Sequence, residues 1–346
     1  MLKRYDHGGD VFSQRVELDF SVNVNPLGMP AAVRQAVIDG VDSYATYPDP
    51  QCRKLREELG AFLGVSPDWI VCGNGAADLI IRTCLILGPA VVAVPAPTFS
   101  EYEKAALMAG ADVKICVLKG PAFAFDDTFL SSLRAFRPDM FFLCNPNNPT
   151  GVLTSPKGVE TFADLCEELG TWFVVDECFL AFTDQASSRS LLPSHPHMIV
   201  LDAFTKMYAM AGLRLGFIVS ANPELVDKVA RFGQSWNVSG PAQAAGSAAV
   251  GLGEDWIRRT QEYVRSEGAF LREGLRALGF QVWDGAANYT MFRSEKPLVE
   301  PMLERGILIR SCSNYTGLDG RYFRVGLKSH AENVRLLEAL REVVKG

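Results

Sequence analysis

The chain lacks the features that would mark a zinc protein, a disulfide-stabilised protein or a membrane protein. It has four histidines and no C-x-x-C spacing, and its eight cysteines lie singly at positions 52, 72, 84, 116, 144, 166, 178 and 312. This pattern suggests neither a zinc site nor a disulfide framework, so reduced thiols in the cytoplasm are the simplest expectation. No window approaches the ~20 apolar residues that span a bilayer. The first 20 residues also lack the apolar core of a signal peptide.

An excess of positive charge is missing as well. The chain has 34 Lys and Arg against 40 Asp and Glu, and its net charge is −6. This balance argues against nucleic acid or an acidic membrane as the principal partner. With 346 residues, of which 48% are hydrophobic and 21% charged, the composition is typical of a soluble globular protein with a large core. We expect a main domain and a smaller one.

Short apolar runs alternate with helical stretches through the middle of the chain. We expect a helix over about 156–169 and strands over 69–73, 90–94, 112–118, 140–144, 171–176, 198–202 and 215–220. Near-continuous apolar strands separated by amphipathic helices predict a mostly parallel sheet that is covered on both faces, in an α/β domain.

The two ends of the chain follow a different pattern. From residue 222 to about 278 the sequence is helical, and the tail then mixes the strand-like runs YTMFR, ILIR and YFRVGL with a final helix over about 330–345. We therefore predict an N-terminal lid segment and part of a small α+β domain in residues 1–45. The large domain is expected to span residues 46–254, and the C-terminal part of the small domain residues 255–346.

Four polar clusters follow predicted strands directly. They are CGNGAAD (72–78), CNPNNPTG (144–151), VVDECF (174–179) and DAFTK (202–206). In an open parallel sheet, ligands bind beyond the carboxyl ends of the strands, where the loops converge. We expect these clusters to meet at one edge of the sheet and to form the site.

Two isolated charges indicate the chemistry of that site. Lys206 and Arg214 are the only Asp, Glu, Lys or Arg residues between Asp202 and Glu224. A lysine in apolar surroundings must lose its charge or find a partner, and a lysine with a lowered pKa can form a Schiff base with an aldehyde. Asp176 could hold a pyridine nitrogen protonated, and Asn148 could donate to a phenolate oxygen. Together these are the requirements of pyridoxal 5′-phosphate.

Each element of this set has a plainer explanation when taken alone. Asp176 could be a helix N-cap, and Asn148 a turn residue fixed by its neighbouring prolines. The turn GNGAAD could belong to a dinucleotide-binding fingerprint or to an ordinary strand–helix connection. Its backbone amides and the positive end of the helix dipole also suit a phosphate. Only the combination with Lys206 favours the cofactor site.

The ordered series GNG, P-T-F, NPNNPTG, VVDE and T-K-x(7)-G-L-R-L-G-F resembles the fold type I pyridoxal-phosphate enzymes of the aspartate aminotransferase superfamily over essentially the whole chain. The resemblance implies that Lys206 carries the cofactor covalently, Asp176 pairs with its ring nitrogen, Asn148 bonds its ring hydroxyl and Phe99 stacks on the ring. It also implies a homodimer, in which the cofactor phosphate is held by Asn74, Gly75, Ala76, Thr205 and Arg214, with Tyr47 reaching over from the neighbouring subunit.

The tail ILIRSCSNYTGLDGRYFRVGL and the N-terminal HGG carry a narrower resemblance. With LDFSVNVNPLGMP and TYPDP, they are similar to the L-threonine O-3-phosphate decarboxylases of cobalamin biosynthesis, which form (R)-1-amino-2-propanol O-2-phosphate and CO2. This implies a phosphoamino acid substrate contacted by His7, Gly8, Asn23, Asn148, Arg310 and Arg324. Without the resemblance, the two arginines would pass as solvated cations and HGG as a disordered terminus.

Three other functions stay open at this point. A histidinol-phosphate-type aminotransferase would share the cofactor set and also bind an amino phosphate. A decarboxylase of O-phospho-L-serine would differ by one methyl group, which is worth only ~1–3 kcal/mol of discrimination in a pocket. A non-catalytic binding protein on the same fold is the third alternative, and the presence of Lys206 argues against it.

Overall fold

The computed structural model describes residues 7–118, 120 and 122–345. Within this part of the chain the central sheet has seven strands in the order β2-β8-β7-β6-β5-β3-β4. β8 runs antiparallel to both of its neighbours and the other pairs are parallel, which confirms the predicted mostly parallel sheet. The strands are β2 (Ile70–Gly73), β3 (Val91–Ala96), β4 (Asp112–Val117), β5 (Met140–Cys144), β6 (Trp172–Asp176), β7 (Met198–Ala203) and β8 (Gly216–Val219).

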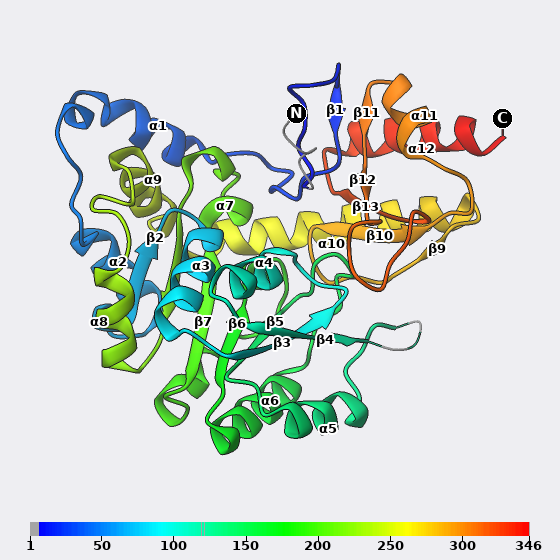
Figure 1. The fold of residues 1–346 in the computed structure, drawn as a ribbon. Coiled ribbons are helices and arrows are strands. Elements are labelled where there is room, and N and C mark those ends of the chain that lie inside the picture. The colour runs from blue at the N-terminus through cyan, green and yellow to red at the C-terminus, as the bar shows by residue number, and fades with distance from the viewer. Residues whose placement is uncertain (1–6, 119, 121, 346) are drawn as a thin grey trace.

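Helices cover both faces of this sheet because its strands are apolar on both sides. In β5, Phe142 faces a core shared with α3 (Ala76–Leu87) and α4 (Glu101–Met108). The adjacent Phe141 faces the opposite core, which includes α5 (Asp127–Phe136) and α6 (Pro156–Leu169). Figure 1 shows these two helix pairs on opposite sides of the strands. These layers agree with the predicted α/β domain whose sheet is covered on both faces.

A smaller lobe is built from the two ends of the chain (Figure 1). Its antiparallel sheet has the order β12-β13-β10-β9, and a separate parallel pair joins β1 to β11. The N-terminal strand is thus paired with the C-terminal region, as the sequence suggested. The elements are β1 (Leu18–Asp19), β9 (Gln281–Val282), β10 (Tyr289–Arg293), α11 (Val299–Glu304), β11 (Ile307–Leu308), β12 (Arg310–Ser311), β13 (Tyr322–Gly326) and α12 (His330–Lys345).

The remaining helices connect these lobes and complete the cover of the sheet. α1 packs against α9, so this part of the N-terminal 45 residues lies beside the large lobe and not in the small one. The long α10 passes from one lobe to the other in Figure 1. The helices are α1 (Ala31–Asp39), α2 (Arg53–Leu63), α7 (Phe204–Met207), α8 (Pro223–Arg231), α9 (Gly240–Val250) and α10 (Gly253–Ala277). The domain boundaries themselves stay a prediction.

Short 3-10 turns complete the secondary structure. They are η1 (Val41–Ala45), η2 (Pro67–Trp69), η3 (Leu180–Phe182), η4 (Ser188–Ser194) and η5 (Ala211–Leu213). The helical region expected from residue 222 to 278 is divided, because Gly233 and Trp236 adopt positive φ between α8 and α9.

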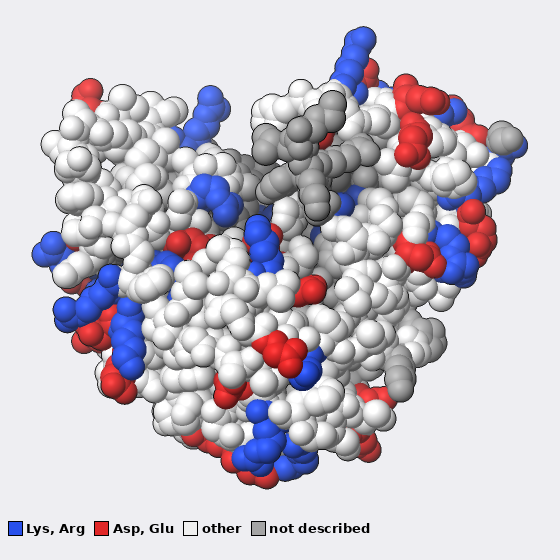
Figure 2. All heavy atoms as spheres, viewed as in Figure 1, with Lys and Arg blue, Asp and Glu red and all other residues white. Residues whose placement is uncertain are grey.

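The described surface agrees with the balanced composition. In the face shown in Figure 2, Lys and Arg side chains are interspersed with Asp and Glu. Among the described residues, no helix combines the length and hydropathy that a membrane span requires. In the same part of the chain, no cluster of His, Cys, Asp and Glu has a metal-binding arrangement.

Gly151 joins the two lobes at a position where a side chain does not fit. Its φ is +74°, and a Cβ there would lie 2.6 Å from Cα of Gly285. Gly64 has a similar φ of +68° with open space around it. We expect Gly64→Ala to lower the free energy of unfolding by about 1 kcal/mol and Gly151→Ala by about 2–4 kcal/mol, since only the latter adds a clash to the backbone strain.

Urea denaturation of both variants measures the difference. Equal losses for the two would mean that the contact between residues 151 and 285 is loose in solution.

Candidate functional site

The predicted polar clusters converge on one cavity of about 400 Å³ at the carboxyl edge of the central sheet. The large lobe supplies residues that follow β3, β5, β6 and β7, and the chain ends supply the opposite wall. Of the residues predicted for the site, the following line the cavity: His7, Gly8, Asn23, Ala76, Phe99, Asn148, Asp176, Thr205, Lys206, Arg214, Arg310 and Arg324. The sequence therefore predicted most of the lining.

Lys206 is placed by the short helix α7, directly after β7. Its backbone oxygen accepts a hydrogen bond of 3.0 Å from the amide of Asn25, which ties this helix to the N-terminal segment. Burial lowers the pKa of Lys206 to about 8, and the positive charge of Arg324 acts in the same direction. An amine with such a pKa is partly neutral near physiological pH and can act as a nucleophile.

Asp176 ends β6, is buried and lines the cavity. The hydroxyl of Tyr102 donates to its Oδ2 at 2.6 Å, and the Cys178 amide donates to its Oδ1 at 3.0 Å. Burial raises the pKa of Asp176, while these donors act to lower it. A carboxylate oxygen can accept more than one hydrogen bond, so Asp176 retains capacity for a protonated ring nitrogen.

Arg324 of the small lobe meets Asn148 of the large lobe at the cavity. Arg324 donates to Oδ1 of Asn148 and, at 2.8 Å, to the backbone oxygen of Ser21. Its guanidinium also lies 5.5 Å from the ring centroid of Tyr289. Within the described part of the chain, Arg324 Nε and Asn23 Oδ1 are buried without a hydrogen-bond partner. Such atoms are costly unless a ligand satisfies them.

The two arginines are neighbours by strand register. Arg310 of β12 is directly opposite Arg324 of β13 in an antiparallel pair, so both side chains leave the sheet on the same face. Arg310 donates to Oδ1 of Asn314 at 2.8 Å and lies 5.5 Å from the ring centroid of Tyr315. Two guanidinium groups on one face repel each other, and an anionic ligand would relieve this repulsion.

The cradle for a phosphate is at the start of α3. Gly75 precedes this helix with a φ of +84°, and a Cβ there would lie 2.5 Å from Nη2 of Arg214. Ala76 and Ala77 line the cavity together with Thr205. This arrangement places a helix N-terminus, a hydroxyl and a guanidinium around one end of the cavity, which suits a phosphate.

Asn74 and Gly75 are not among the described residues that line the cavity, and their predicted role at the phosphate stays a prediction. Asn74 is exposed, and its amide donates to Oδ2 of Asp78 at 3.0 Å. The amide of Gly75 donates to the oxygen of Gly73 at 2.8 Å. Both amides are therefore hydrogen-bonded within the turn, and the two residues form the chain segment that leads into α3.

Tyr47 also lies away from the cavity of its own chain. Its side chain is 77% exposed and stacks on Trp236, with ring centroids 4.2 Å apart. An exposed, braced tyrosine is compatible with contact to a neighbouring subunit, and its predicted role stays a prediction.

Some lining residues lie outside the clusters and site residues predicted from the sequence. They are Ser21, Val22, Glu101, Lys104 and Tyr315, with Tyr102 behind Asp176. Ala77, Cys144, Cys178 and Phe179 also line the cavity, and they belong to the predicted clusters. Tyr102 lies on the buried face of α4, where a tyrosine cannot be told from an ordinary core aromatic in sequence. Glu101 and Lys104 are three residues apart on the same helix. In the sequence alone, such a pair looks like part of a solvent-exposed helical face.

The residues of the cavity fit pyridoxal 5′-phosphate. Among the described lining residues, five Lys and Arg side chains face only two carboxylates, so the cavity favours an anionic ligand. The unsatisfied atoms of Arg324 and Asn23 and the cradle at Gly75 show where polar groups of ligands would be accepted.

Comparisons with known proteins agree with this arrangement. Residues 15–340 match the family described as aminotransferase class I and II. The chain is 36% identical over 356 residues to a threonine-phosphate decarboxylase from Salmonella typhimurium, covering 98% of this chain and 97% of the relative.

Two solved structures extend the likeness. The histidinol-phosphate aminotransferase from Clostridium acetobutylicum superposes with a TM-score of 0.87 at 28% identity, over 95% of this chain and 99% of that one. The L-threonine-O-3-phosphate decarboxylase from Porphyromonas gingivalis gives a TM-score of 0.84 at 24% identity, over 95% and 100% of the two chains. At that identity the second likeness bears on the fold alone.

The lowered pKa of Lys206 predicts how the cofactor-free protein reacts with added pyridoxal 5′-phosphate. The neutral amine is the nucleophile, and with a pKa of about 8 its fraction rises steeply between pH 7 and 8 and then levels. We expect the rate of covalent binding to rise about tenfold from pH 7 to 9. Visible absorbance measures this rate, and Lys206→Ala is expected to retain no label after borohydride reduction. A rate that still climbs at pH 10, as for an ordinary lysine, would contradict the prediction.

Proposed function

The chain belongs to the aminotransferase class I and II family, whose cofactor is pyridoxal 5′-phosphate, and we propose that it decarboxylates O-phospho-L-threonine. The products are (R)-1-amino-2-propanol O-2-phosphate and CO2, and the step serves cobalamin biosynthesis. The relative from Salmonella typhimurium supports this choice of substrate. The observation that carries it is the cross-strand pair Arg310 and Arg324, because a phosphoamino acid has two anionic groups for two adjacent guanidiniums.

The large lobe holds the cofactor in this proposal. Lys206 binds it covalently, Asp176 keeps its ring nitrogen protonated, and Phe99 lies against its ring. Asn148 donates its amide to the ring oxygen, since its Oδ1 already accepts from Arg324. The phosphate is bound by Ala76, Thr205 and Arg214, with Asn74 and Gly75 shaping the turn.

The chain ends hold the substrate. Arg324 and Asn23 bind the carboxylate, whereas His7, Gly8 and Arg310 bind the phosphate. The bound cofactor supplies an electron sink that stabilises the electron pair left at Cα when a bond perpendicular to its ring plane breaks. Arg324 therefore selects decarboxylation by holding the carboxylate in that orientation.

Two groups in the cavity can handle the proton that returns to Cα. Lys206 Nζ has a pKa of about 8, so it can both accept and donate a proton near neutral pH. Tyr315 also lines the cavity, and its hydroxyl lies 3.4 Å from Oδ1 of Asn148.

A histidinol-phosphate-type aminotransferase is the second candidate. The structural likeness to the enzyme from Clostridium acetobutylicum favours it, and its substrate also carries an amine and a phosphate. In that reaction Lys206 would remove the Cα proton while the carboxylate site of Arg324 served the amino acceptor. Decarboxylation of O-phospho-L-serine is the variant of the first proposal that lacks one methyl group.

The proposal includes a cytoplasmic homodimer. Tyr47 and Trp236 are exposed and stacked, and Ile38 and Val41 nearby in sequence are 51% and 59% exposed. Apolar groups of this kind favour burial against a second copy of the chain. Tyr47 would then complete the phosphate site of the partner, and the eight free cysteines suit a reducing compartment.

A turnover assay distinguishes the reactions. The holoenzyme is expected to release CO2 from O-phospho-L-threonine and to form no glutamate from histidinol phosphate plus 2-oxoglutarate. The reason is that Arg324 and Asn23 hold the substrate carboxylate in the orientation from which it leaves as CO2. O-phospho-L-serine is expected to react within about 10–200-fold of the threonine compound. Glutamate formation without CO2 release would overturn the proposal in favour of the aminotransferase.

Substitution of the two arginines should separate their roles. Arg324→Lys loses a bidentate contact to the carboxylate, so kcat/KM should fall about 100-fold or more. Arg310→Met should raise KM about tenfold or more with a smaller change in kcat, and should reduce the preference for phosphothreonine over threonine.

Arg321→Met is the matched control, because Arg321 pairs with Asp319 and Glu295 away from the cavity. Equal effects of Arg310→Met on phosphothreonine and on threonine would show that Arg310 does not bind the phosphate.

A further inference from the structure

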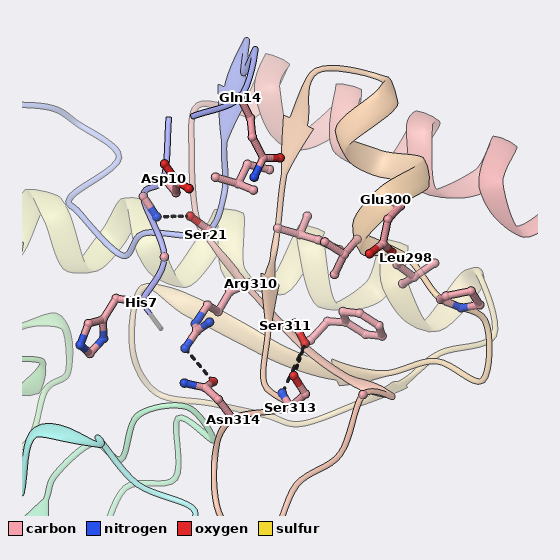
Figure 3. Close-up of a pocket in the computed structure, with 18 residues that line it drawn as sticks. His7, Asp10, Gln14, Ser21, Leu298, Glu300, Arg310, Ser311, Ser313 and Asn314 are labelled. Carbon is pink, nitrogen blue, oxygen red and sulfur yellow. Dashed lines mark hydrogen bonds between the residues drawn. The ribbon is translucent and has the colours of Figure 1, made fainter. Parts of the chain in front are cut away.

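Arg310 lies at the junction of two cavities. The cofactor cavity and a second cavity, each of about 400 Å³, share the lining residues His7, Gly8, Ser21 and Arg310. Figure 3 shows the second cavity, with the hydrogen bond between Arg310 and Asn314 drawn as a dashed line. The Arg310 guanidinium thus borders two spaces, and Lys206 lines the first of them.

Two consecutive residues of one turn contact this guanidinium, one from each cavity. Asn314 lines the second cavity, and its Oδ1 accepts the hydrogen bond from Arg310 at 2.8 Å. Tyr315 lines the cofactor cavity, and its ring centroid is 5.5 Å from Cζ of Arg310. An aromatic face attracts a guanidinium, and the attraction is stronger where water is excluded. Because Tyr315 is only 8% exposed, its ring draws Arg310 towards the cofactor side.

The ring of Tyr315 is fixed by its backbone and by its hydroxyl. The Tyr315 amide donates to the oxygen of Cys312 at 3.0 Å, and the Leu318 amide donates to the oxygen of Tyr315 at 3.0 Å. At the far end of the side chain, the hydroxyl is 3.4 Å from Oδ1 of Asn148 in the large lobe. The ring therefore spans the distance between the Arg310 guanidinium and the turn that carries Asn148.

The other arginine of the cross-strand pair is supported in the same way. Arg324 lies 5.5 Å from the ring centroid of Tyr289, and the Tyr289 hydroxyl donates to the oxygen of Asn147 at 2.8 Å. Each arginine is thus backed by a tyrosine whose hydroxyl reaches the turn that follows β5. This repeated arrangement indicates that the tyrosines set where the guanidiniums lie relative to the large lobe.

We propose that Tyr315 is a specificity-determining residue, whose aromatic ring positions Arg310 for the phosphate of the substrate. With the ring in place, the guanidinium faces the cofactor cavity and can form a bidentate, charge-assisted contact to a phosphate. An unphosphorylated amino acid has no group for this contact. Without the ring, the guanidinium follows Asn314 towards the second cavity. The inference rests on the proposed function only in requiring that the substrate carries a phosphate.

The test compares Tyr315→Phe with Tyr315→Leu in the full-length holoenzyme. Tyr315→Phe keeps the ring, so the KM for O-phospho-L-threonine and the preference over L-threonine should stay within about threefold of the wild type. Tyr315→Leu removes the ring, so this KM should rise about tenfold with a smaller change in kcat, and the preference should fall by a similar factor. Rescue by phenylalanine separates the role of the ring from that of the hydroxyl.

Further variants show whether Tyr315 acts through Arg310. Tyr322→Leu is the matched control, since the Tyr322 ring lies 5.6 Å from that of Trp283 and, among the described residues, is outside the lining of both cavities. In Arg310→Met, adding Tyr315→Leu should change KM by less than about threefold, because no guanidinium is left to position. If Tyr315→Leu unfolds at a much lower temperature than Tyr322→Leu, Tyr315→Met replaces it, since its flexible side chain fills irregular gaps.

Binding of inorganic phosphate to the holoenzyme provides a readout that does not depend on which reaction the enzyme catalyses. In a titration followed by phosphorus nuclear magnetic resonance, the Kd should rise about tenfold in Tyr315→Leu and change less than about threefold in Tyr315→Phe. If the wild type decarboxylates nothing, the proposed function fails while this measurement still tests Tyr315. The inference is overturned by wild-type phosphate affinity in Tyr315→Leu, by an equal loss in Tyr315→Phe, by additive effects of the Tyr315 and Arg310 changes, or by a wild type that binds no phosphate.

Discussion

The site depends on a concentration of positive charge in a cavity that shields it from water. Lys206, Arg214, Arg310 and Arg324 line one cavity, and Asp176 and Glu101 are the carboxylates that the described lining sets against them. At an effective dielectric constant of about 20, two like charges 5 Å apart repel by about 3 kcal/mol. Burial, with the positive charge of Arg324 acting in the same direction, lowers the pKa of Lys206 to about 8. The anions of the cofactor and of the substrate can relieve the repulsion that remains.

Strand register is what brings these groups together. Arg310 is opposite Arg324 in the small sheet, and Cys144 is opposite Asp176 in the large one. Because side chains alternate between the two faces of a strand, a shift of one residue would turn each group away from the cavity. Val175, next to Asp176, accordingly lies in the opposite hydrophobic core. The chemistry of the cavity is therefore a consequence of the same alternation that builds the core.

Sequence reasoning predicted most of the fold because the informative patterns are local. β5 and α6 have the expected bounds, and the polar clusters containing Asn148, Asp176 and Lys206 converge as predicted. The packing of α1 against α9 could not be anticipated, since their contact joins segments about 200 residues apart and leaves no periodic signal in either.

The same limit applies within the site. Tyr102 bonds Asp176 across 74 residues of sequence and His7 bonds Glu101 across 94, so neither pairing is visible in a motif. Asn74 and Gly75 were placed on the phosphate by their motif, and the structure shows their amides engaged in the turn itself. A motif identifies the turn, but which of its amides face the cavity depends on the backbone path.

The segment from Ser21 to Asn25 links the two halves of the site mechanically. Its first residue accepts a hydrogen bond from Arg324, and its last donates to the backbone of Lys206 and, at 2.7 Å, to that of Met207. Gly326 packs so closely on the segment that a Cβ would lie 2.3 Å from the oxygen of Val22. The distance between the guanidinium of Arg324 and the amine of Lys206 is therefore set by five residues of chain. Under the proposed function, the bond that breaks at Cα is chosen by the rigidity of this segment as much as by the identity of the catalytic groups.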